Sequence, residues 1–236
     1  AGDYRVVVTN TYGSTTSNSA TLQVGYAPAI GSHPVSADQV AGSSVTFSIT
    51  LSAGSAPLSY QWQKDSVNIS GATSISYTIA SLTTTHAGTY RCIASNAFGT
   101  VTSNAATLIV GVAPAITTQP VSQNAIVGSS PAFTVTATGT ATLSYQWQKD
   151  GTNISGATSA SYTITSAQSD DNGSYRCLIS NNYGSANSSS ATLAVGYVPA
   201  FALHPISGDK ILGSSFTFSI SLSAGTEPVS YQWQKD

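Results

Sequence analysis

The densest run of acidic side chains in this sequence is Asp170-Asp171-Asn172-Gly173, and clustered carboxylates are the first pattern to test for metal or acid–base chemistry. A calcium loop places its oxygen ligands at alternate positions along the chain, and this run does not have that spacing. Asp, Asn and Gly also favour tight turns, each for its own conformational reason. The run is therefore interpreted as a corner or turn.

The three histidines lie too far apart in sequence to suggest a metal-ligand set. His33 and His204 each precede a proline in a repeated segment, and the middle copy of that segment has Gln119 instead. Because a neutral amide is tolerated there, the pattern favours a surface strand position. His86 stands where the next copy has Asp171, so we expect a weaker corner cap in its own repeat.

The thiols of Cys92 and Cys177 are the remaining candidate nucleophiles, and no histidine lies at a helpful spacing from either. Both fall at apolar positions of predicted strands, where burial keeps a thiol protonated and unreactive. The sequence therefore predicts no catalytic residue, no cofactor and no metal. We expect that the protein is not an enzyme.

Composition excludes two further classes of partner. Only 7% of the 236 residues are charged, against about 25% in an average soluble domain. The net charge is -2, and the 7 basic residues form no cluster that could neutralise successive phosphates, so nucleic acid is excluded as a partner. No stretch approaches the roughly 18 consecutive apolar residues of a membrane span, so we expect none in this segment.

The chain repeats itself about every 86 residues, which defines its organisation. The segment Tyr-Gln-Trp-Gln-Lys-Asp occurs at 60–65, 145–150 and 231–236. Phasing these copies predicts the C-terminal part of one domain at 1–25, complete domains at 26–111 and 112–197, and the N-terminal part of another at 198–236.

Within each repeat the apolar residues alternate with polar ones, which is the period of a half-buried strand. Val45, Phe47 and Ile49 alternate with Thr and Ser. Leu58, Tyr60 and Trp62 alternate with Ser and Gln. Turn residues separate such runs about every ten residues, and no sustained helical period appears. The sequence predicts an all-β fold of about seven short strands per repeat, packed as a β-sandwich.

A Trp followed 25–30 residues later by Asp-x-Gly-x-Tyr-x-Cys resembles the immunoglobulin-like domain, particularly its intermediate set (I-set). Two repeats carry the pattern, and Trp233 carries its first half alone. The residues are Trp62 with Gly88, Tyr90 and Cys92, and Trp147 with Asp171, Gly173, Tyr175 and Cys177. The chain is most similar in character to Ser/Thr-rich tandem copies in large bacterial secreted or cell-surface proteins. The resemblance implies a structural core at Ile49, Trp62, Tyr90, Cys92, Val135, Trp147, Tyr175, Cys177, Ile220 and Trp233.

The sequence departs from this family in its cysteines. The inter-sheet disulfide of the family needs a second Cys, and the aligned positions hold Ile49, Val135 and Ile220. Cys92 and Cys177 belong to different domains, so they are not expected to approach within the 7 Å between Cα atoms that a bridge requires. The domains are expected to fold without a disulfide.

The joints between repeats are short, with only Gly111-Val112-Ala113-Pro114 between the predicted last and first strands of two complete repeats. Proline limits φ and forces the preceding residue into extended geometry, so we expect semi-rigid joints in which Tyr26 and Tyr197 pack between neighbouring domains. The joint residues are Gly25, Tyr26, Pro28, Gly111, Pro114, Gly196, Tyr197 and Pro199.

Three functions remain open from the sequence. The first is a non-catalytic structural or adhesive array, as a stalk, spacer or filament segment that is extracellular or at the cell surface. Low charge leaves strand edges unprotected, so self-association is physically cheap. The second is a module that binds glycans or other surface proteins. The third is an accessory region of a large secreted enzyme, which only flanking sequence would reveal.

Overall fold

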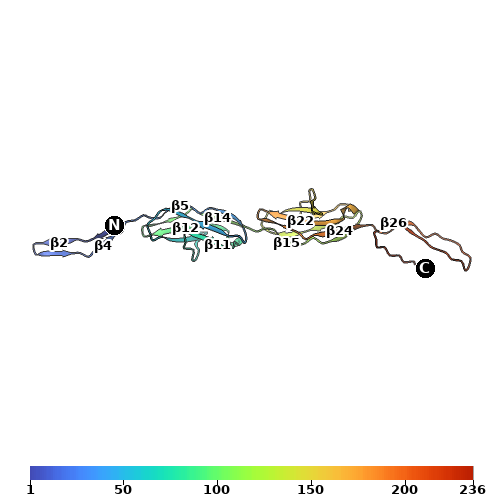
Figure 1. Cartoon of the computed structure of the whole chain (residues 1–236), viewed down its shortest axis with the longest axis horizontal. Helices are drawn as coiled ribbons and strands as arrows, with labels where there is room; N and C mark the ends of the chain where they lie inside the picture. Colours follow the sequence, from blue (N-terminus) through green and yellow to red (C-terminus); the bar gives the residue numbers. More distant parts are fainter. Residues whose placement is uncertain (236) are drawn as a thin grey trace. The chain divides into compact units, whose positions relative to one another are not determined.

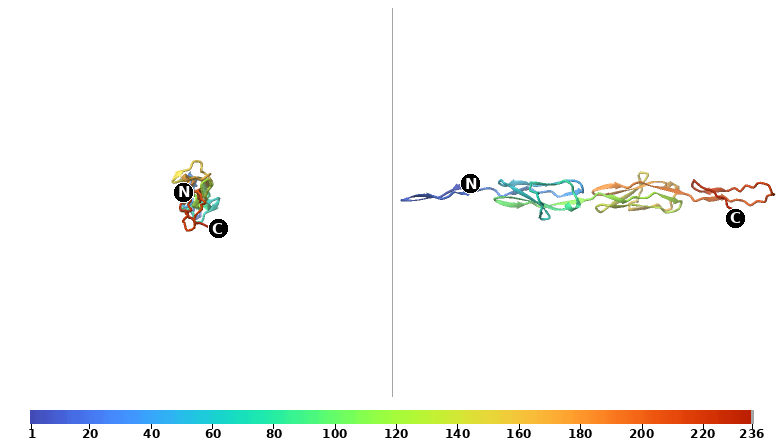
Figure 2. Two further views of the ribbon diagram at one scale, coloured as in Figure 1. Left: turned by 90° about the vertical axis from the view of Figure 1, so that its right-hand side faces the viewer. Right: turned by 90° about the horizontal axis from the view of Figure 1, so that it is seen from below.

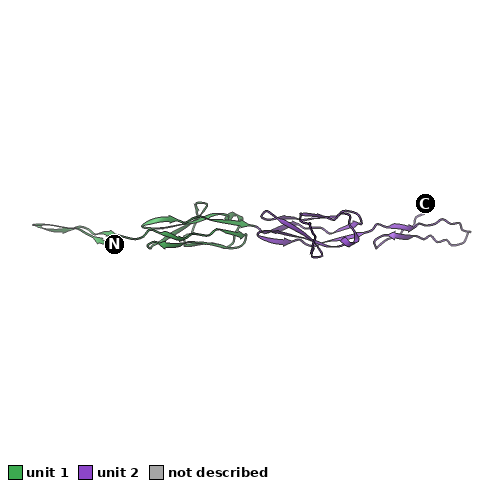
Figure 3. Cartoon of the chain, turned by 90° about the horizontal axis from the view of Figure 1, so that it is seen from above, with its two compact units in different colours: residues 1–111 green, residues 112–236 purple. Residues whose placement is uncertain are grey.

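The computed structural model describes residues 1–235, so Asp236, the last residue of the third Tyr-Gln-Trp-Gln-Lys-Asp copy, lies outside the described residues. The chain divides into two compact units, residues 1–111 and 112–236 (Figure 3). Each unit contains one closed sandwich and one open stretch of strands (Figure 1). The four segment boundaries inferred from the repeat stay predictions.

The sandwich of the first unit has two layers. One layer follows the strand order β10-β9-β12-β14-β6, with β13 also paired to β12. The other contains the pairs β11–β7 and β5–β8. The elements are β5 (Ala29–Ser32), β6 (Ala37–Val40), β7 (Val45–Ser48), β8 (Thr50–Ala53), β9 (Ser59–Lys64), β10 (Val67–Asn68), β11 (Ser76–Ile79), the 3-10 helix η1 (Thr84–His86), β12 (Gly88–Asn96), β13 (Gly99–Thr102) and β14 (Ala106–Gly111).

The sandwich of the second unit repeats this topology. Its larger layer follows the order β16-β24-β22-β19-β20, with β23 on β22, and the pairs β17–β21 and β15–β18 form the other. The elements are β15 (Ala115–Thr118), β16 (Gln123–Ile126), β17 (Ala132–Thr134), β18 (Thr136–Thr138), β19 (Ser144–Lys149), β20 (Thr152–Asn153), β21 (Ser161–Thr163), the 3-10 helix η2 (Ser169–Asp171), β22 (Gly173–Asn181), β23 (Gly184–Asn187) and β24 (Ala191–Gly196).

The remaining strands form open ribbons that no second layer covers (Figures 1 and 2). Every residue of 1–24 is exposed, and most of 198–235 is exposed as well. The pairs are β1–β4, β2–β3 and β25–β26. These strands are β1 (Gly2–Tyr4), β2 (Val7–Asn10), β3 (Gly13–Thr16), β4 (Ala20–Leu22), β25 (Ala200–Leu203) and β26 (Ser221–Ala224).

The first two strands of each sandwich belong to different layers. β5 pairs with β8 in one layer, and β6 then pairs in parallel with β14 in the other. Pro34 lies buried at the crossing between them. A proline has no N–H to offer a sheet, so this residue ends one pairing where the next must begin.

The core of each sandwich is a stack of aromatic rings on facing strands. Trp62 lies opposite Cys92 in the β9–β12 register, and both side chains are fully buried. Phe47 stacks on Tyr90 with ring centroids 4.7 Å apart. The second unit repeats the arrangement, with Trp147 opposite Cys177 and Phe133 at 4.8 Å from Tyr175.

Apolar residues stand at the positions where the inter-sheet disulfide of the family would need its second Cys. Ile49 is buried in the same cluster as Cys92, and Val135 in the same cluster as Cys177. At 2% and 1% exposure, their branched side chains fill the space between the layers. Apolar packing therefore occupies the place of the bridge.

The two core residues expected near the C-terminal end are placed differently. Trp233 is 53% exposed and Ile220 is half-buried. In the complete sandwiches the equivalent Trp62 and Trp147 pack against rings of the other layer, on β11 and β21, and the strands of 198–235 include no counterpart of those two strands. The prediction of a buried core there was wrong for this chain, because one half of a sandwich cannot bury its own inner face.

Candidate functional site

The residues tested first for chemistry do not converge in the structure. In the described part of the chain no three residues of the types His, Cys, Asp and Glu gather closely enough to hold a metal ion. Asp170 and Asp171 lie in η2, where Asp171 Oδ2 accepts the Gln168 N–H at 2.8 Å. The acidic run thus closes a turn. Among residues 1–235, no helix is long and apolar enough to span a membrane.

Two of the three histidines, His33 and His86, accept hydrogen bonds from backbone N–H groups, and His204 is exposed. His33 Nδ1 accepts the N–H of Asn104 at 3.0 Å, and Gln119 Oε1 accepts the N–H of Ser189 at 2.8 Å in the second unit. Both side chains accept a hydrogen bond from a backbone N–H at the same place in the repeat. This shared role is the physical reason that one copy has a histidine where the other has a glutamine.

The corner cap of the first unit has the same geometry as that of the second. His86 Nδ1 accepts the Thr83 N–H at 2.9 Å, as Asp171 does for Gln168 at 2.8 Å. The weaker cap expected for His86 does not appear as a missing hydrogen bond, because an unprotonated ring nitrogen can accept in the place of a carboxylate oxygen.

Each corner is closed by a tyrosine hydroxyl. Tyr90 donates to the carbonyl of His86 at 2.7 Å, and Tyr175 donates to that of Asp171 at 2.7 Å. Burial raises the pKa of each phenol to about 12. Burial also raises the pKa of Cys92 to about 11, and the pKa of Cys177 is raised for the same reason. Both thiols are free, buried and protonated at neutral pH.

A recurring set of polar contacts lies at the joints, and we call it the joint clamp. In the first unit it comprises Tyr26, Ser55 and Asn96. The Tyr26 N–H donates to Ser55 Oγ at 2.9 Å, and the Tyr26 carbonyl accepts from the Ser55 N–H at 3.0 Å. Asn96 Nδ2 donates to the carbonyls of Tyr26 and Ser55, both at 2.8 Å. One joint residue is thus held by two different loops of the sandwich.

The second unit contains an equivalent clamp of Val112, Thr140 and Asn181. The Val112 N–H donates to Thr140 Oγ1 at 2.8 Å, and its carbonyl accepts from the Thr140 N–H at 3.0 Å and from Asn181 Nδ2 at 2.8 Å. The next joint keeps the hydroxyl part: the Tyr197 N–H donates to Thr226 Oγ1 at 2.7 Å, and its carbonyl accepts from Thr226 N–H at 3.1 Å.

Glycine precedes the held residue at all three joints, and at two of them the clamp leaves no room for a side chain on it. A Cβ on Gly25 would lie 2.3 Å from the Phe98 ring and 2.7 Å from Ser55 Oγ, and one on Gly196 would lie 2.8 Å from Thr226 Oγ1. No Cβ fits at these distances, so glycine permits the close approach of the joint to the loop beneath it.

The other predicted joint residues are divided between interior and surface. Pro28, Pro114 and Gly111 are buried, whereas Pro199 is exposed. The tyrosines do not pack as expected: Tyr26 is 75% and Tyr197 50% exposed. The fold holds these residues by their backbone N–H and C=O groups, which leaves the rings in solvent.

Sequence reasoning missed the two side chains that close the clamp. Asn96 and Asn181 occupy equivalent places in the repeat, and Asn10 occupies the same place near the N-terminus. Ser55, Thr140 and Thr226 likewise keep a hydroxyl at one offset. Both the asparagine position and the hydroxyl position could have been found by comparing the copies for polar residues that stay the same in type, as was done for the apolar ones.

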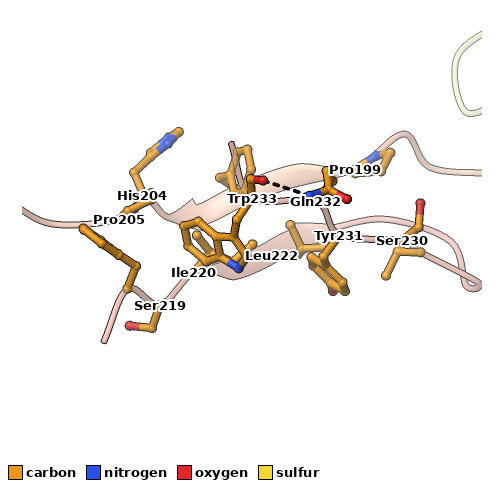
Figure 4. Close-up of a pocket in the computed structure, with 13 residues that line it drawn as sticks. Pro199, His204, Pro205, Ser219, Ile220, Leu222, Ser230, Tyr231, Gln232 and Trp233 are labelled. Atoms are coloured by element: carbon orange, nitrogen blue, oxygen red, sulfur yellow. Dashed lines mark hydrogen bonds between the residues drawn. The ribbon is translucent and has the colours of Figure 1, made fainter. Parts of the chain in front are cut away.

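An open hollow of about 570 Å³ lies on residues 199–233, and Phe218 is among the residues that line it. Ile220 and Trp233 line it as well (Figure 4). The Phe218 and Trp233 rings lie 6.1 Å apart between centroids, close to the 6.3 Å of Phe47 and Trp62 in the complete core. This hollow is therefore the inner face of half a sandwich, and its geometry is not that of a ligand pocket.

A sequence model of the immunoglobulin domain matches residues 27–96 and 113–181, the two sandwiches. The chain belongs to the immunoglobulin domain family. Its fold is all-β, with two immunoglobulin-like domains in tandem. The I-band fragment I67–I69 of titin has a similar structure, with a TM-score of 0.62 at 26% identity over 77% of this chain and 70% of that one.

Immunoglobulin-domain proteins of animals are similar to it in sequence. Leucine-rich repeats and immunoglobulin-like domains protein 3 of Mus musculus is 26% identical over 237 residues, which cover 89% of this chain and 21% of that protein. Cell adhesion molecule DSCAML1 of Gallus gallus is 28% identical over 208 residues, covering 78% and 10%. The immunoglobulin chain described here thus spans about a fifth or less of the length of these relatives.

Proposed function

We propose that this chain is part of a non-catalytic, adhesive and structural array of immunoglobulin domains, located outside the cell or at its surface. The observation that carries the proposal is the joint clamp. The clamp recurs at equivalent positions, and its polar side chains hold the chain at the ends of the domains. A catalytic site would instead bring acids, bases or metal ligands together. A similarity to a protein named as a cell adhesion molecule supports the same function.

The partner that we propose is another protein surface, which includes a second copy of this chain. The edge strands β11 and β21 carry exposed Ser and Thr where soluble proteins usually place charge. Their outward backbone groups offer a place for strand-to-strand association. A stalk or filament segment is the form of array that such edges favour.

A second candidate is a module that binds glycans or another surface protein, and the third is an accessory region of a large secreted enzyme. No observed feature favours either of them over the array. The finer assignment to the intermediate set rests on the spacing of Trp62, Tyr90 and Cys92. The relatives reported above are animal proteins, so a bacterial source stays a prediction that they do not support.

A bead assay tests the adhesive function. Beads that carry the full chain through a terminal tag are expected to aggregate with one another at neutral pH. A matched chain with Thr78→Lys and Thr163→Lys places charge on the two edge strands, at exposed positions, and is expected to aggregate less. Beads that remain dispersed at high coating density, with no capture of a second bead type carrying the same chain, would contradict self-adhesion.

A further inference from the structure

One polar segment recurs unchanged in both sandwiches and takes no part in the joint clamp. Asn-Ile-Ser-Gly-Ala-Thr occurs at 68–73 and again at 153–158. Its first three residues fit the pattern Asn-x-Ser/Thr, the acceptor signal for asparagine-linked oligosaccharides when the middle residue is not proline. In a chain this rich in serine and threonine, the pattern also arises by chance. The surroundings of each side chain must therefore support an acceptor site.

In the first unit the segment follows the outermost strand of the larger layer. Asn68 ends the edge strand β10 and pairs with Gln63 of β9. The residue is exposed, and its Oδ1 accepts a hydrogen bond from Gln63 Nε2 at 2.8 Å. Within the described residues, Asn68 Nδ2 makes no hydrogen bond. The nitrogen that would carry a sugar is thus free, and the bond to Gln63 fixes its carboxamide at the edge of the sheet.

The other two residues of the pattern face in different directions. Ile69 packs on the core, and its carbonyl accepts from Gln61 Nε2 at 2.7 Å and from the Ala72 N–H at 3.2 Å. Ser70 is exposed, and in the part of the chain that the structure describes its hydroxyl makes no hydrogen bond. Because the isoleucine faces inward, the asparagine and the hydroxyl on either side of it are both left on the outer surface.

The second unit repeats this arrangement. Asn153 ends β20, is exposed, and accepts from Gln148 Nε2 at 2.7 Å through Oδ1. Ile154 packs on the second core, and Ser155 is exposed. Contacts within the domain therefore account for the asparagine and the isoleucine of the segment, but they give no role to the serine in either copy.

The pattern also occurs at 172–174 and 187–189, in the second unit alone. Asn172 follows η2, and its Oδ1 accepts the N–H of Val195 on β24 at 2.5 Å. Ser188, the middle residue of the other occurrence, is buried. These two occurrences are built into the corner and the sheet of the domain, unlike the repeated segment at its edge.

We propose that Asn68 and Asn153 are acceptor sites for asparagine-linked oligosaccharides, and that the sugars cover the β10 and β20 edges of the two domains. The reaction needs an oligosaccharyltransferase and a polyprenyl-diphosphate oligosaccharide as the donor. The asparagine Nδ2 forms a bond to the anomeric carbon of the sugar, while the bond from that carbon to the diphosphate breaks. The diphosphate lipid leaves, and the amide gives up one proton to a base of the transferase.

A sugar at these positions would protect edges that have no other protection. Proteins usually guard an edge strand with charge, with proline or with a covering element. The two residues of β10 and the two of β20 include no charge and no proline. A glycan is bulky and solubilising, so it would block strand pairing there and leave β11 and β21 for association. The inference rests on the location outside the cell that the proposed function assigns.

Secretion of the full chain from cultured animal cells tests the two sites. Mass spectrometry before and after digestion with peptide-N-glycosidase locates the sugars, because the enzyme leaves aspartate in place of each acceptor asparagine. We expect sugars on Asn68 and Asn153. Ser70→Ala and Ser155→Ala keep both asparagines and are expected to abolish the modification, whereas Ser70→Thr should retain it. The control Asn104→Gln alters an exposed asparagine outside the pattern and should leave the mass lost on digestion unchanged.

Analytical ultracentrifugation of the secreted chain, before and after enzymatic removal of the sugars, tests whether they cover the edges. Removal is expected to increase self-association, and the double variant Ser70→Ala, Ser155→Ala should behave like the digested chain. A wild-type chain that lacks a sugar at Asn68 or at Asn153 would overturn the proposal, as would digestion that leaves association unchanged. Beads carrying chain made in bacteria, without these sugars, test adhesion separately, so the two proposals can fail independently.

Discussion

The buried tryptophan is the residue on which each core depends. Trp62 and Trp147 are fully covered, and each indole N–H donates to a backbone carbonyl, of Ser74 and Ser159 respectively, at 2.9 Å. The ring fills the space between the layers, and its polar atom is satisfied without water. Stability at this scale comes from one large side chain that is matched in both shape and hydrogen bonding.

Replacing Trp147 by Ala should lower the free energy of unfolding of residues 112–197 by about 3–5 kcal/mol, because the cavity is large and fully buried. The matched control is Trp233→Ala, at a side chain that is 53% exposed, where a change within about 0.5 kcal/mol is expected. Urea denaturation followed by residue-resolved NMR measures both. Equal losses in the two variants would contradict the placement of Trp147.

The hydroxyl of Tyr175 is the second residue-level contribution. Tyr175→Phe removes only the bond to the Asp171 carbonyl, so a loss of about 0.5–1.5 kcal/mol is expected. Tyr145→Phe is the control, since the Tyr145 hydroxyl makes no hydrogen bond within the described residues, and the stability should change little. A Tyr175→Phe chain as stable as wild type in urea would show that the corner bond contributes nothing.

The stability of both domains should fall in alkali, because burial raises the pKa of phenol and thiol groups in their cores. The pKa of Tyr90 and Tyr175 is raised by burial from an ordinary 10.0 to about 12, and that of Cys92 from 9.0 to about 11. Between about pH 9 and 12 the folded chain thus binds more protons than the unfolded chain, so the free energy of unfolding decreases as pH rises. Urea titrations across this range check the slope, which Tyr175→Phe should make shallower for residues 112–197.

The last strand of each domain is interrupted, between β13 and β14 in the first unit and between β23 and β24 in the second. Ser103 and Ser188 lie buried at these interruptions. Their hydroxyls accept the N–H of Cys92 at 3.0 Å and of Cys177 at 2.8 Å. Near the N-terminus, Ser17 accepts the Val6 N–H at 3.0 Å in the same way. The hydroxyl substitutes for a missing ladder bond in the middle of the sheet.

Ser188→Ala should therefore cost more than an ordinary surface change. It leaves the buried N–H of Cys177 without its acceptor, at a cost of about 1–3 kcal/mol. Ser189→Ala, at the exposed neighbouring residue, is the control and should be nearly neutral. Chemical denaturation separates the two, and similar values would mean that the hydroxyl is replaceable.

At the scale of the whole molecule, stability is distributed unevenly along the chain. The two sandwiches bury their apolar residues, whereas the ribbons 1–24 and 198–235 expose theirs, including Tyr4, Val8 and Trp233. Segments with few buried contacts open at low free energy. Within residues 1–235, the closed domains are therefore expected to be the stable parts and the ribbons the labile ones.

Hydrogen exchange of the full chain should reproduce that distribution. Amides of β12 and β22 are expected to exchange slowest, and those of residues 1–24 and 198–235 are expected to exchange nearly as fast as in an unfolded chain. Mass spectrometry of peptic fragments measures all four segments in one experiment. Strong protection of residues 1–24 in dilute solution would contradict an open ribbon.

The sequence by itself determined the repeat, the strands and the residues of the two cores, because an apolar period of two and a copied motif are local signals that every copy carries. Only the tertiary structure decided which polar residues hold the joints. Asn96 bonds to a residue 70 positions away and Ser55 to one 29 positions away, and no local pattern records such partners. The structure also decided that Trp233 is exposed, since burial depends on a second layer that comes from elsewhere in a sandwich.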